Sequence, residues 1–172
     1  ALLAGDALAL PVLDYEFDGP AQAAGYDALR PAFAETLSPA LPAGLNLARQ
    51  LWWQQQCFPA AFARAEAILT YPQYWTWRLG GALIGECTSL GCHTDLWASR
   101  AGDYSSLARE RGWLPKFPRV VPAWDSPACL RASIARATGL PGDCAVHAGV
   151  HDSNAGFARH LEQVLQIVVI NA

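Results

Sequence analysis

The segment CAVHAGVHDSNAGFARHLEQVL, residues 144–165, limits most strongly what this chain can fold into. An apolar strand pattern reaches Gly149–Val150, and a helical pattern follows at once, with Asp152 at its start. The apolar positions on one face of that helix are Phe157, Leu161, Val164 and Leu165. A strand that turns directly into a helix is typical of α/β folds, and the rest of the chain, with few strand patterns and many helical ones, predicts the same class.

Proline and glycine mark the ends of further predicted elements. Apolar runs around Gly5 and Asp6 predict a hairpin at the start, and residues 16–43 are expected to be irregular, with one short helix near 26–33. Periodic apolar residues predict helices in the following segments: GLNLARQLWWQQQ (44–56), FPAAFARAEAI (58–68, opened by Pro59), YPQYWTWRLGG (71–81, from Pro72 to Gly80 and Gly81) and YSSLARERGW (104–113, with Leu107 inward).

The clearest helix pattern is DSPACLRASIARATGL, residues 125–140. Ser126 can cap the helix, Pro127 suits the first turn, and Gly139 suits the end. Its shared apolar face comprises Leu130, Ile134 and Ala137.

Composition excludes several classes of protein. Apolar residues make up 52% and charged residues 16% of the chain, which predicts a packed interior. The net charge is −3 and Lys and Arg are scattered, so neither nucleic acid nor an anionic membrane is an expected partner. The opening ALLAGDALAL lacks a basic leader and the closing QIVVINA is too short to span a bilayer, so we expect neither a signal peptide nor a membrane segment.

The five cysteines show no C-x-x-C pair. They predict neither a disulfide framework nor a zinc ribbon, and reduced thiols indicate a cytoplasmic protein. A zinc site built on Cys87, Cys92 and His93 is a weaker alternative, because C-x4-C-H lacks the paired spacing of structural zinc. A Ser/His/Asp hydrolase is disfavoured because no G-x-S-x-G elbow occurs, and no glycine-rich phosphate loop is present either.

Asp152 is the first candidate functional residue. The crevice beyond the carboxyl ends of strands is where ligands bind in open α/β sheets, and a helix N-terminus stabilises an ionised carboxylate there. Such a group is ready to accept a proton. The alternative is that Asp152 only caps the last helix, which its residue type and position support equally well.

The second candidate is TSLGCHTDLW, residues 88–97, which shows no helical periodicity. Hydrogen-bonding side chains beside an aromatic ring suit a hydroxyl-rich ligand such as a sugar. The group comprises Thr88, Ser89, His93, Thr94, Asp95 and Trp97. The alternative is an ordinary loop whose Trp97 anchors the core. The remaining helical tryptophans are expected to be core residues first and ligand platforms second: Trp52, Trp53, Trp75 and Trp77.

Taken in order, YPQYWTWRLGG, GECTSLGCHTDLW, the 126–140 segment and HAGVHDSNAG resemble the second half of the N-terminal domain of the FGGY carbohydrate kinases. A PVLDYE-like strand after the first hairpin is similar to the L-fuculose and L-rhamnulose kinase subgroup. The resemblance implies that residues 1–172 form a single partial domain of the ribonuclease H-like (actin-like ATPase) fold, helix-rich with a few strands, without the C-terminal ATP domain.

The resemblance also implies functional residues. The family's G-x-x-D motif falls on residues 149–152, so Asp152 matches the general base that deprotonates the sugar hydroxyl. The positions that match sugar contacts are Tyr15, Glu16, Asn46, Gln73, His93 and His151. ATP and Mg²⁺ would be bound mainly by segments missing from this chain, including a D-x-G-T-T hairpin expected before residue 1, and this chain itself would hold no metal.

The implied function is the sugar-binding part of an ATP-dependent kinase that phosphorylates a ketose or deoxyketose. The alternative is a non-catalytic carbohydrate-binding remnant or a truncated product, since the closing EQVLQIVVINA departs from the family pattern. Missing strands would leave a sheet edge unpaired and open to homo-oligomer formation.

Overall fold

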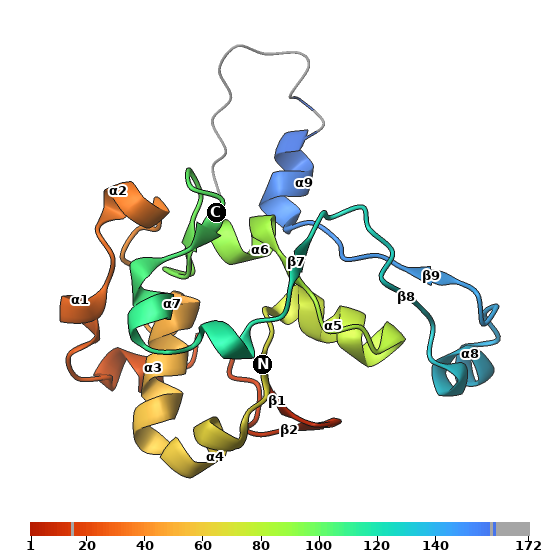
Figure 1. Cartoon of the computed structure of the whole chain (residues 1–172), viewed down its shortest axis with the longest axis horizontal. Coiled ribbons are helices and arrows are strands. Elements are labelled where there is room, and N and C mark those ends of the chain that lie inside the picture. Colours follow the sequence, from red (N-terminus) through yellow and green to blue (C-terminus); the bar gives the residue numbers. More distant parts are fainter. Residues whose placement is uncertain (15, 159, 161–172) are drawn as a thin grey trace.

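The computed structural model describes residues 1–14, 16–158 and 160, and Figure 1 shows their arrangement. The strands are β1 (Leu2–Ala4), β2 (Ala7–Leu8), β3 (Ala67–Ile68), β4 (Gly85–Glu86), β5 (Trp97–Ala98), β6 (Asp103–Tyr104), β7 (Val120–Val121), β8 (Ala128–Cys129) and β9 (Ala145–Val146). The α-helices are α1 (Tyr26–Leu29), α2 (Phe33–Thr36), α3 (Leu47–Cys57), α4 (Pro59–Arg64), α5 (Tyr71–Gly80), α6 (Cys87–Gly91), α7 (Ser106–Glu110), α8 (Ala132–Thr138) and α9 (Asp152–Ala158). Two 3-10 turns among these residues are η1 (Gly19–Gln22) and η2 (Leu114–Lys116).

The N-terminal hairpin forms as predicted. β1 pairs antiparallel with β2 on one side and with β3 on the other. Gly5 in the turn has a φ of 58°, a conformation that glycine adopts without strain. The strand expected after the hairpin is absent over residues 11–14, where Pro11 has no amide hydrogen to donate to a ladder.

The main hydrophobic core lies where α3, α4 and α7 meet β1 and β3. Its largest members are Leu2, Tyr26, Leu51, Phe62, Ile68, Leu96, Leu107 and Trp113. The helix predicted over 44–56 appears as α3. The helix predicted over 58–68 begins at Pro59 as expected but ends at Arg64, because residues 67–68 form β3 and pair with β1. The helix predicted over 104–113 appears as α7, with Leu107 buried as expected. Within 16–43, where we predicted a single short helix, the chain forms α1, α2 and η1.

Helix α5 begins and ends where proline and glycine predicted. Pro72 lies in its first turn, and Gly81 ends it with a φ of 87°. A Cβ on Gly80 would lie 2.9 Å from the Cβ of Ala128, so the glycine allows β8 to pack directly against the helix.

The helix predicted to start at Ser126 is wrong in its first half. Residues 128–129 form β8, which pairs antiparallel with β9, and α8 begins only at Ala132. The amide of Leu130 donates to the Cys144 carbonyl at 3.0 Å, so long-range pairing takes up the backbone groups that a helix would have used. The predicted end is confirmed, since Gly139 closes α8 with a φ of 74°.

The strand predicted to reach Gly149–Val150 ends at Val146. Ala148 and Gly149 instead donate their amides to Asp125 and Ala123, at 2.9 and 3.0 Å, and the chain then enters α9. The far part of the predicted helix face, including Leu161, Val164 and Leu165, lies outside the described residues.

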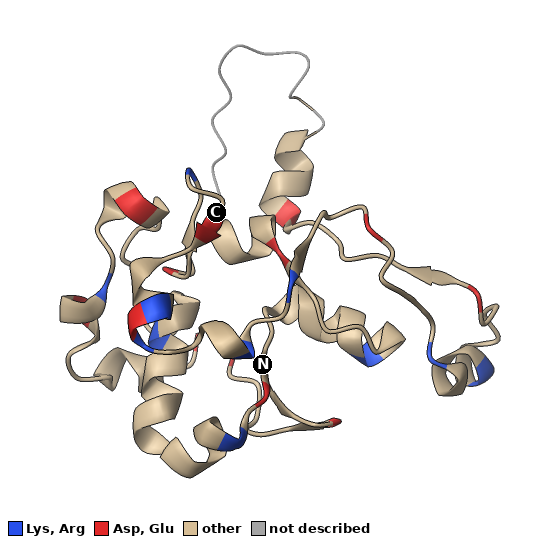
Figure 2. Ribbon diagram, in the orientation of Figure 1, with Lys and Arg blue, Asp and Glu red and all other residues tan. Residues whose placement is uncertain are grey.

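Charged residues are distributed along many elements rather than gathered on one, as Figure 2 shows. In the part of the chain that the structure describes, no helix combines the length and apolarity needed to cross a bilayer.

Candidate functional site

A cavity of about 770 Å³ opens between the N-terminal segment, the start of α5, the end of α6 and the loop before α9. Its wall is mainly apolar, with a few polar side chains, as is usual for small-molecule sites. The wall includes Asp14, Tyr71, Tyr74, Trp75, Ser89, Cys92, His93 and His151.

The aromatic side of the cavity comes from the first turns of α5. Tyr71 and Tyr74 stack with ring centroids 6.5 Å apart, and Trp75 meets Tyr74 edge-on at 5.6 Å. Trp75 keeps 47% of its surface exposed, whereas Trp77, two residues on, is 5% exposed and belongs to the core. The expectation that helical tryptophans are core residues first therefore holds for Trp77 and fails for Trp75.

The other predicted tryptophans are mostly packing residues. Trp97 is buried, and Trp52 is half-buried, packs against the main core and donates its ring N–H to the Ala24 carbonyl at 3.1 Å. Trp53 lies between the rings of Phe17 and Phe58, each with a centroid 5.6 Å away.

His93 is held on the cavity wall by a strained loop. His93 and Asp95 have φ values of 42° and 64°, in the left-handed region that non-glycine residues seldom occupy. The Nδ1 atom of His93 lies 3.1 Å from the Leu45 carbonyl oxygen, which only accepts hydrogen bonds. In the neutral ring, Nδ1 therefore carries the proton and Nε2 is an acceptor for a ligand hydroxyl.

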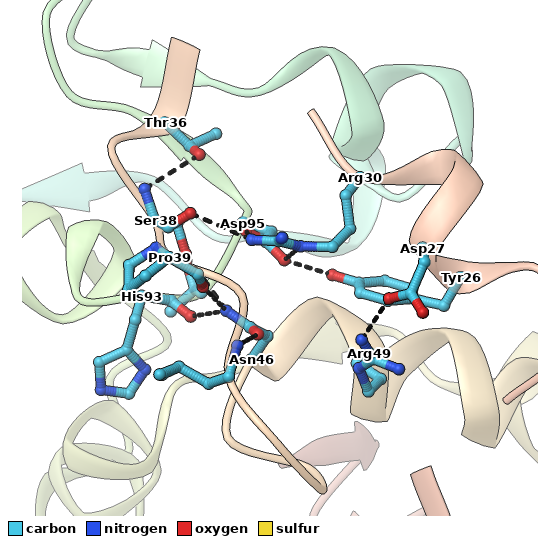
Figure 3. A network of polar contacts seen from close by, with 12 residues as sticks. Tyr26, Asp27, Arg30, Thr36, Ser38, Pro39, Asn46, Arg49, His93 and Asp95 are labelled. Atoms are coloured by element: carbon cyan, nitrogen blue, oxygen red, sulfur yellow. Dashed lines mark hydrogen bonds and ion pairs between the residues drawn. The ribbon is translucent and has the colours of Figure 1, made fainter. Parts of the chain in front are cut away.

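Asn46 fixes the backbone of this loop, as Figure 3 shows. Its Nδ2 donates to the carbonyl of His93 at 2.7 Å, and its Oδ1 accepts the amide of Leu41 at 2.9 Å. Asn46 is fully buried and does not line the cavity. In this structure Asn46 positions His93, a residue predicted to contact the sugar. The predicted contact between Asn46 itself and sugar stays a prediction.

Asp95 anchors the other end of the loop. Its carboxylate accepts two hydrogen bonds from Arg30, both of 2.9 Å, and one of 2.7 Å from the hydroxyl of Tyr26 (Figure 3). Burial and the neighbouring Asp95 carboxylate hold the pKa of Tyr26 well above its usual range, so its hydroxyl remains a donor. The strained backbone is thus maintained by buried polar contacts, as is common at functional sites.

We predicted no helical periodicity in the segment TSLGCHTDLW, and this is wrong for its first residues, which belong to helix α6. Glu86 is the N-cap residue of this helix. Its carboxylate accepts the amides of Thr88 and Ser89, at 2.8 and 2.9 Å. Serine, threonine, asparagine and aspartate are the usual caps, so a capping glutamate was not expected from sequence.

His151 lines the cavity, and its backbone amide donates to the hydroxyl of Thr88 at 2.9 Å. Its Nε2 lies 3.3 Å from the Oδ1 of Asp152, while its buried Nδ1 has no partner among the described residues. Asp152 starts α9 with 92% of its side chain exposed, and its Oδ1 accepts the amide of Ser153 at 2.6 Å. The carboxylate thus lies beside a cavity-wall residue and is open to solvent.

The remaining predicted contacts have different environments. Gln73 is fully buried, where its side chain bonds Thr70 and donates to the Ala148 carbonyl at 3.1 Å, so it supports the chain before His151. Glu16 is exposed and is not part of the wall, while Tyr15 lies outside the described residues. The acidic residue that does line the cavity is Asp14, which we did not single out from sequence.

Among residues 1–14, 16–158 and 160, no three His, Cys, Asp or Glu side chains are close enough together to hold a metal ion. The alternative zinc site on Cys87, Cys92 and His93 is therefore not assembled in this structure. Cys87 and Cys92 carry raised thiol pKa values, chiefly because of burial.

Replacing Asp152 with asparagine should speed the alkylation of Cys92 near neutral pH. Burial, followed by the negative charge of Asp152, raises the pKa of the Cys92 thiol. Removing that charge lowers the thiol pKa and increases the thiolate fraction, which is the reactive form. Peptide mapping after iodoacetamide treatment gives the rate at each cysteine, with exposed Cys129 as the internal control. An unchanged Cys92 rate would mean that Asp152 does not lie near this wall.

No protein-family profile matches the chain, and no curated protein matches its sequence. Solved structures do match. A carbohydrate kinase from Novosphingobium aromaticivorans is 47% identical, with a TM-score of 0.85 over 91% of this chain and 34% of that chain. A xyloylose kinase from Brucella ovis is 25% identical, with a TM-score of 0.68 over 90% of this chain and 32% of that one.

A ligand-bound xylulose kinase from Lactobacillus acidophilus, 15% identical with a TM-score of 0.62 over 71% of this chain and 25% of that chain, supports the fold alone. The chain is therefore a partial, helix-rich α/β domain of the actin-like ATPase fold, as predicted. It resembles carbohydrate kinases and spans about a third of the length of the first two.

Proposed function

We propose that this chain is the sugar-binding part of an ATP-dependent carbohydrate kinase of the FGGY family that phosphorylates a hydroxyl of a ketose or deoxyketose. The observation that carries the proposal is the cavity between the α5 aromatic rings and the two histidines His93 and His151, with the Asp152 carboxylate beside it. The likeness to carbohydrate kinases supports the same function.

Each side of the cavity suits one part of a sugar. The faces of Tyr74 and Trp75 suit the C–H surface, because aromatic rings offer a broad apolar contact. His93 Nε2 supplies an acceptor for a hydroxyl, and the ring of His151 adds a second imidazole to the wall. The Asp152 carboxylate would accept the proton of the hydroxyl whose oxygen bonds to the transferred phosphorus.

ATP is the phosphoryl donor in this proposal, and Mg²⁺ accompanies it. The described residues contain no acidic cluster for a metal, and the sequence has no glycine-rich phosphate loop, so this chain does not fit a complete nucleotide site. We assign the nucleotide and its metal to another part of the kinase. The five unpaired thiols are typical of a reducing compartment and support our proposal that the protein is cytoplasmic.

Titration calorimetry with the isolated chain tests the sugar site. Two of the matched structures are named as kinases of xylulose and gluconate, so these are the first probes, followed by L-rhamnulose and L-fuculose. We expect one of them to bind without nucleotide, and Trp75→Ala to weaken its affinity by about threefold to tenfold through loss of ring contact. The matched control is Trp124→Ala, since Trp124 is 78% exposed and lies outside the cavity wall. Binding of none of the four, or of gluconate alone, which is not a ketose, would contradict the proposal.

A chimera tests the kinase itself. The aligned third of the Novosphingobium kinase is replaced with this chain, to which it is 47% identical. We expect the chimera to phosphorylate a sugar with ATP. A folded chimera that binds sugar but transfers no phosphate would favour the alternative function, a non-catalytic carbohydrate-binding module.

A further inference from the structure

A buried carboxylate and one hydroxyl connect α6 to the chain that carries Asp152. Glu86 is fully buried, and besides the two amides at the start of α6 it accepts a hydrogen bond of 2.6 Å from the hydroxyl of Thr88. A threonine hydroxyl has one hydrogen to donate and lone pairs to accept with. With its hydrogen directed to Glu86, the Thr88 oxygen accepts the amide of His151 at 2.9 Å, across 63 positions of sequence.

This contact lies just after the last backbone hydrogen bonds that hold the incoming chain, from Ala148 and Gly149 to Asp125 and Ala123. Gly149, just before it, has a φ of 79°, a conformation that glycine adopts freely. Helix α9, just after it, buries none of the residues Asp152–Ala158. Figure 1 shows α9 projecting above α6. Within the described part of the chain, no fully buried residue of α9 fixes the direction in which the helix starts, so local polar contacts carry much of that task.

We infer that Thr88 is a positioning residue, whose hydroxyl, oriented by Glu86, holds His151 on the cavity wall and the neighbouring Asp152 beside it. The effect of this placement on sugar rests on the proposed function: if His151 and Asp152 were displaced, the site would bind and activate sugar poorly. The placement itself is testable without any sugar.

The test compares Thr88→Val with Thr88→Ser in the full chain. Valine keeps the shape of the side chain and removes the hydroxyl, while the backbone amides of residues 88 and 89 can still cap α6 through Glu86. Serine restores the hydroxyl. We expect Thr88→Val to lower the hydrogen-exchange protection of the His151 amide by about fivefold, the effect of losing one hydrogen bond, and Thr88→Ser to retain it. Thr138→Val is the matched control, because the Thr138 hydroxyl donates only within α8.

The alkylation rate of Cys92 supplies a readout that a loss of stability alone would not reproduce. If Thr88 acts by holding Asp152 near Cys92, Thr88→Val should speed alkylation in the wild-type background and add nothing in the Asp152→Asn background. Non-additivity of this kind indicates that two residues act together. Equal effects in both backgrounds, or unchanged His151 protection in Thr88→Val, would overturn the inference.

Binding measurements with sugar distinguish failure of the positioning role from failure of the proposed function. Titration of the Thr88 variants with xylulose and gluconate should show weaker binding for valine than for serine. If the wild-type chain binds neither sugar while the exchange and alkylation effects persist, the proposed function fails and the positioning role stands. If the wild-type chain binds sugar and Thr88→Val binds it equally well, the positioning role fails and the proposed function stands.

Discussion

Replacing Asp95 with alanine is expected to lower the free energy of unfolding by about 3–5 kcal/mol, the usual effect of removing one partner of a buried ion pair. The Asp95 side chain has no solvent exposure, and its carboxylate accepts both hydrogen bonds from Arg30 and one from Tyr26. Alanine would leave the partly buried Arg30 cation and the buried Tyr26 hydroxyl without their acceptor. It would also be held at a φ of 64°, which alanine adopts with strain.

Urea denaturation followed by tryptophan fluorescence measures this loss. Asp95→Asn separates the two causes, because asparagine tolerates the left-handed conformation and still accepts one hydrogen bond, so we expect a smaller loss than for alanine. Asp103→Ala is the matched control: its ion pair with Arg109 is exposed on both sides, and we expect little change. Equal midpoints for Asp95→Ala and Asp103→Ala would show that the buried network does not stabilise the fold.

The elements that could be predicted from sequence are those whose ends are marked by a proline or a glycine. Helices α4 and α5 begin at or beside a proline, and α5 and α8 end at a glycine with positive φ. Such positions depend on backbone geometry within a few residues, which the sequence carries directly. The hairpin around Gly5 was predictable for the same reason.

The elements that could not be predicted depend on distant partners. Residues 128–129 have a helical pattern, but their pairing with 145–146 and their contact with Gly80 override it. Helix α6 is capped by a glutamate that lies before it, in a strand paired with residues 120–121. No spacing rule connects segments so far apart along the chain.

The candidate site likewise contains residues whose position could be predicted from sequence and residues whose position could not. His93 and His151 were predicted from the resemblance, and both lie on the cavity wall. Asn46 and Gln73 are polar residues of the same kind, but the structure buries them behind the wall, where they bond backbone carbonyls. Whether an amide meets a ligand or holds the residue that does so depends on what packs on either side of it, and only the folded chain shows this.

Asparagine in place of Asp152 is expected to lower the turnover number of the chimeric kinase by about 10²–10⁴-fold, the range for loss of a general base. The side chain keeps its size and one acceptor oxygen, so the start of α9 should persist, but an amide cannot take up the proton of the attacking hydroxyl. Sugar affinity should change little, because Asp152 lies beside the cavity wall and is not part of it.

Asp143→Asn is the matched control, an exposed carboxylate in the turn between α8 and β9 that is outside the cavity wall. Steady-state kinetics with ATP and the preferred sugar give the turnover number and the Michaelis constant separately. A large fall in turnover for Asp152→Asn alone, with an unchanged constant for sugar, identifies a group that acts on the reacting hydroxyl. If Asp152→Asn and Asp143→Asn turn over at the same rate, the carboxylate serves only to begin a helix, and the proton must leave the sugar by another route.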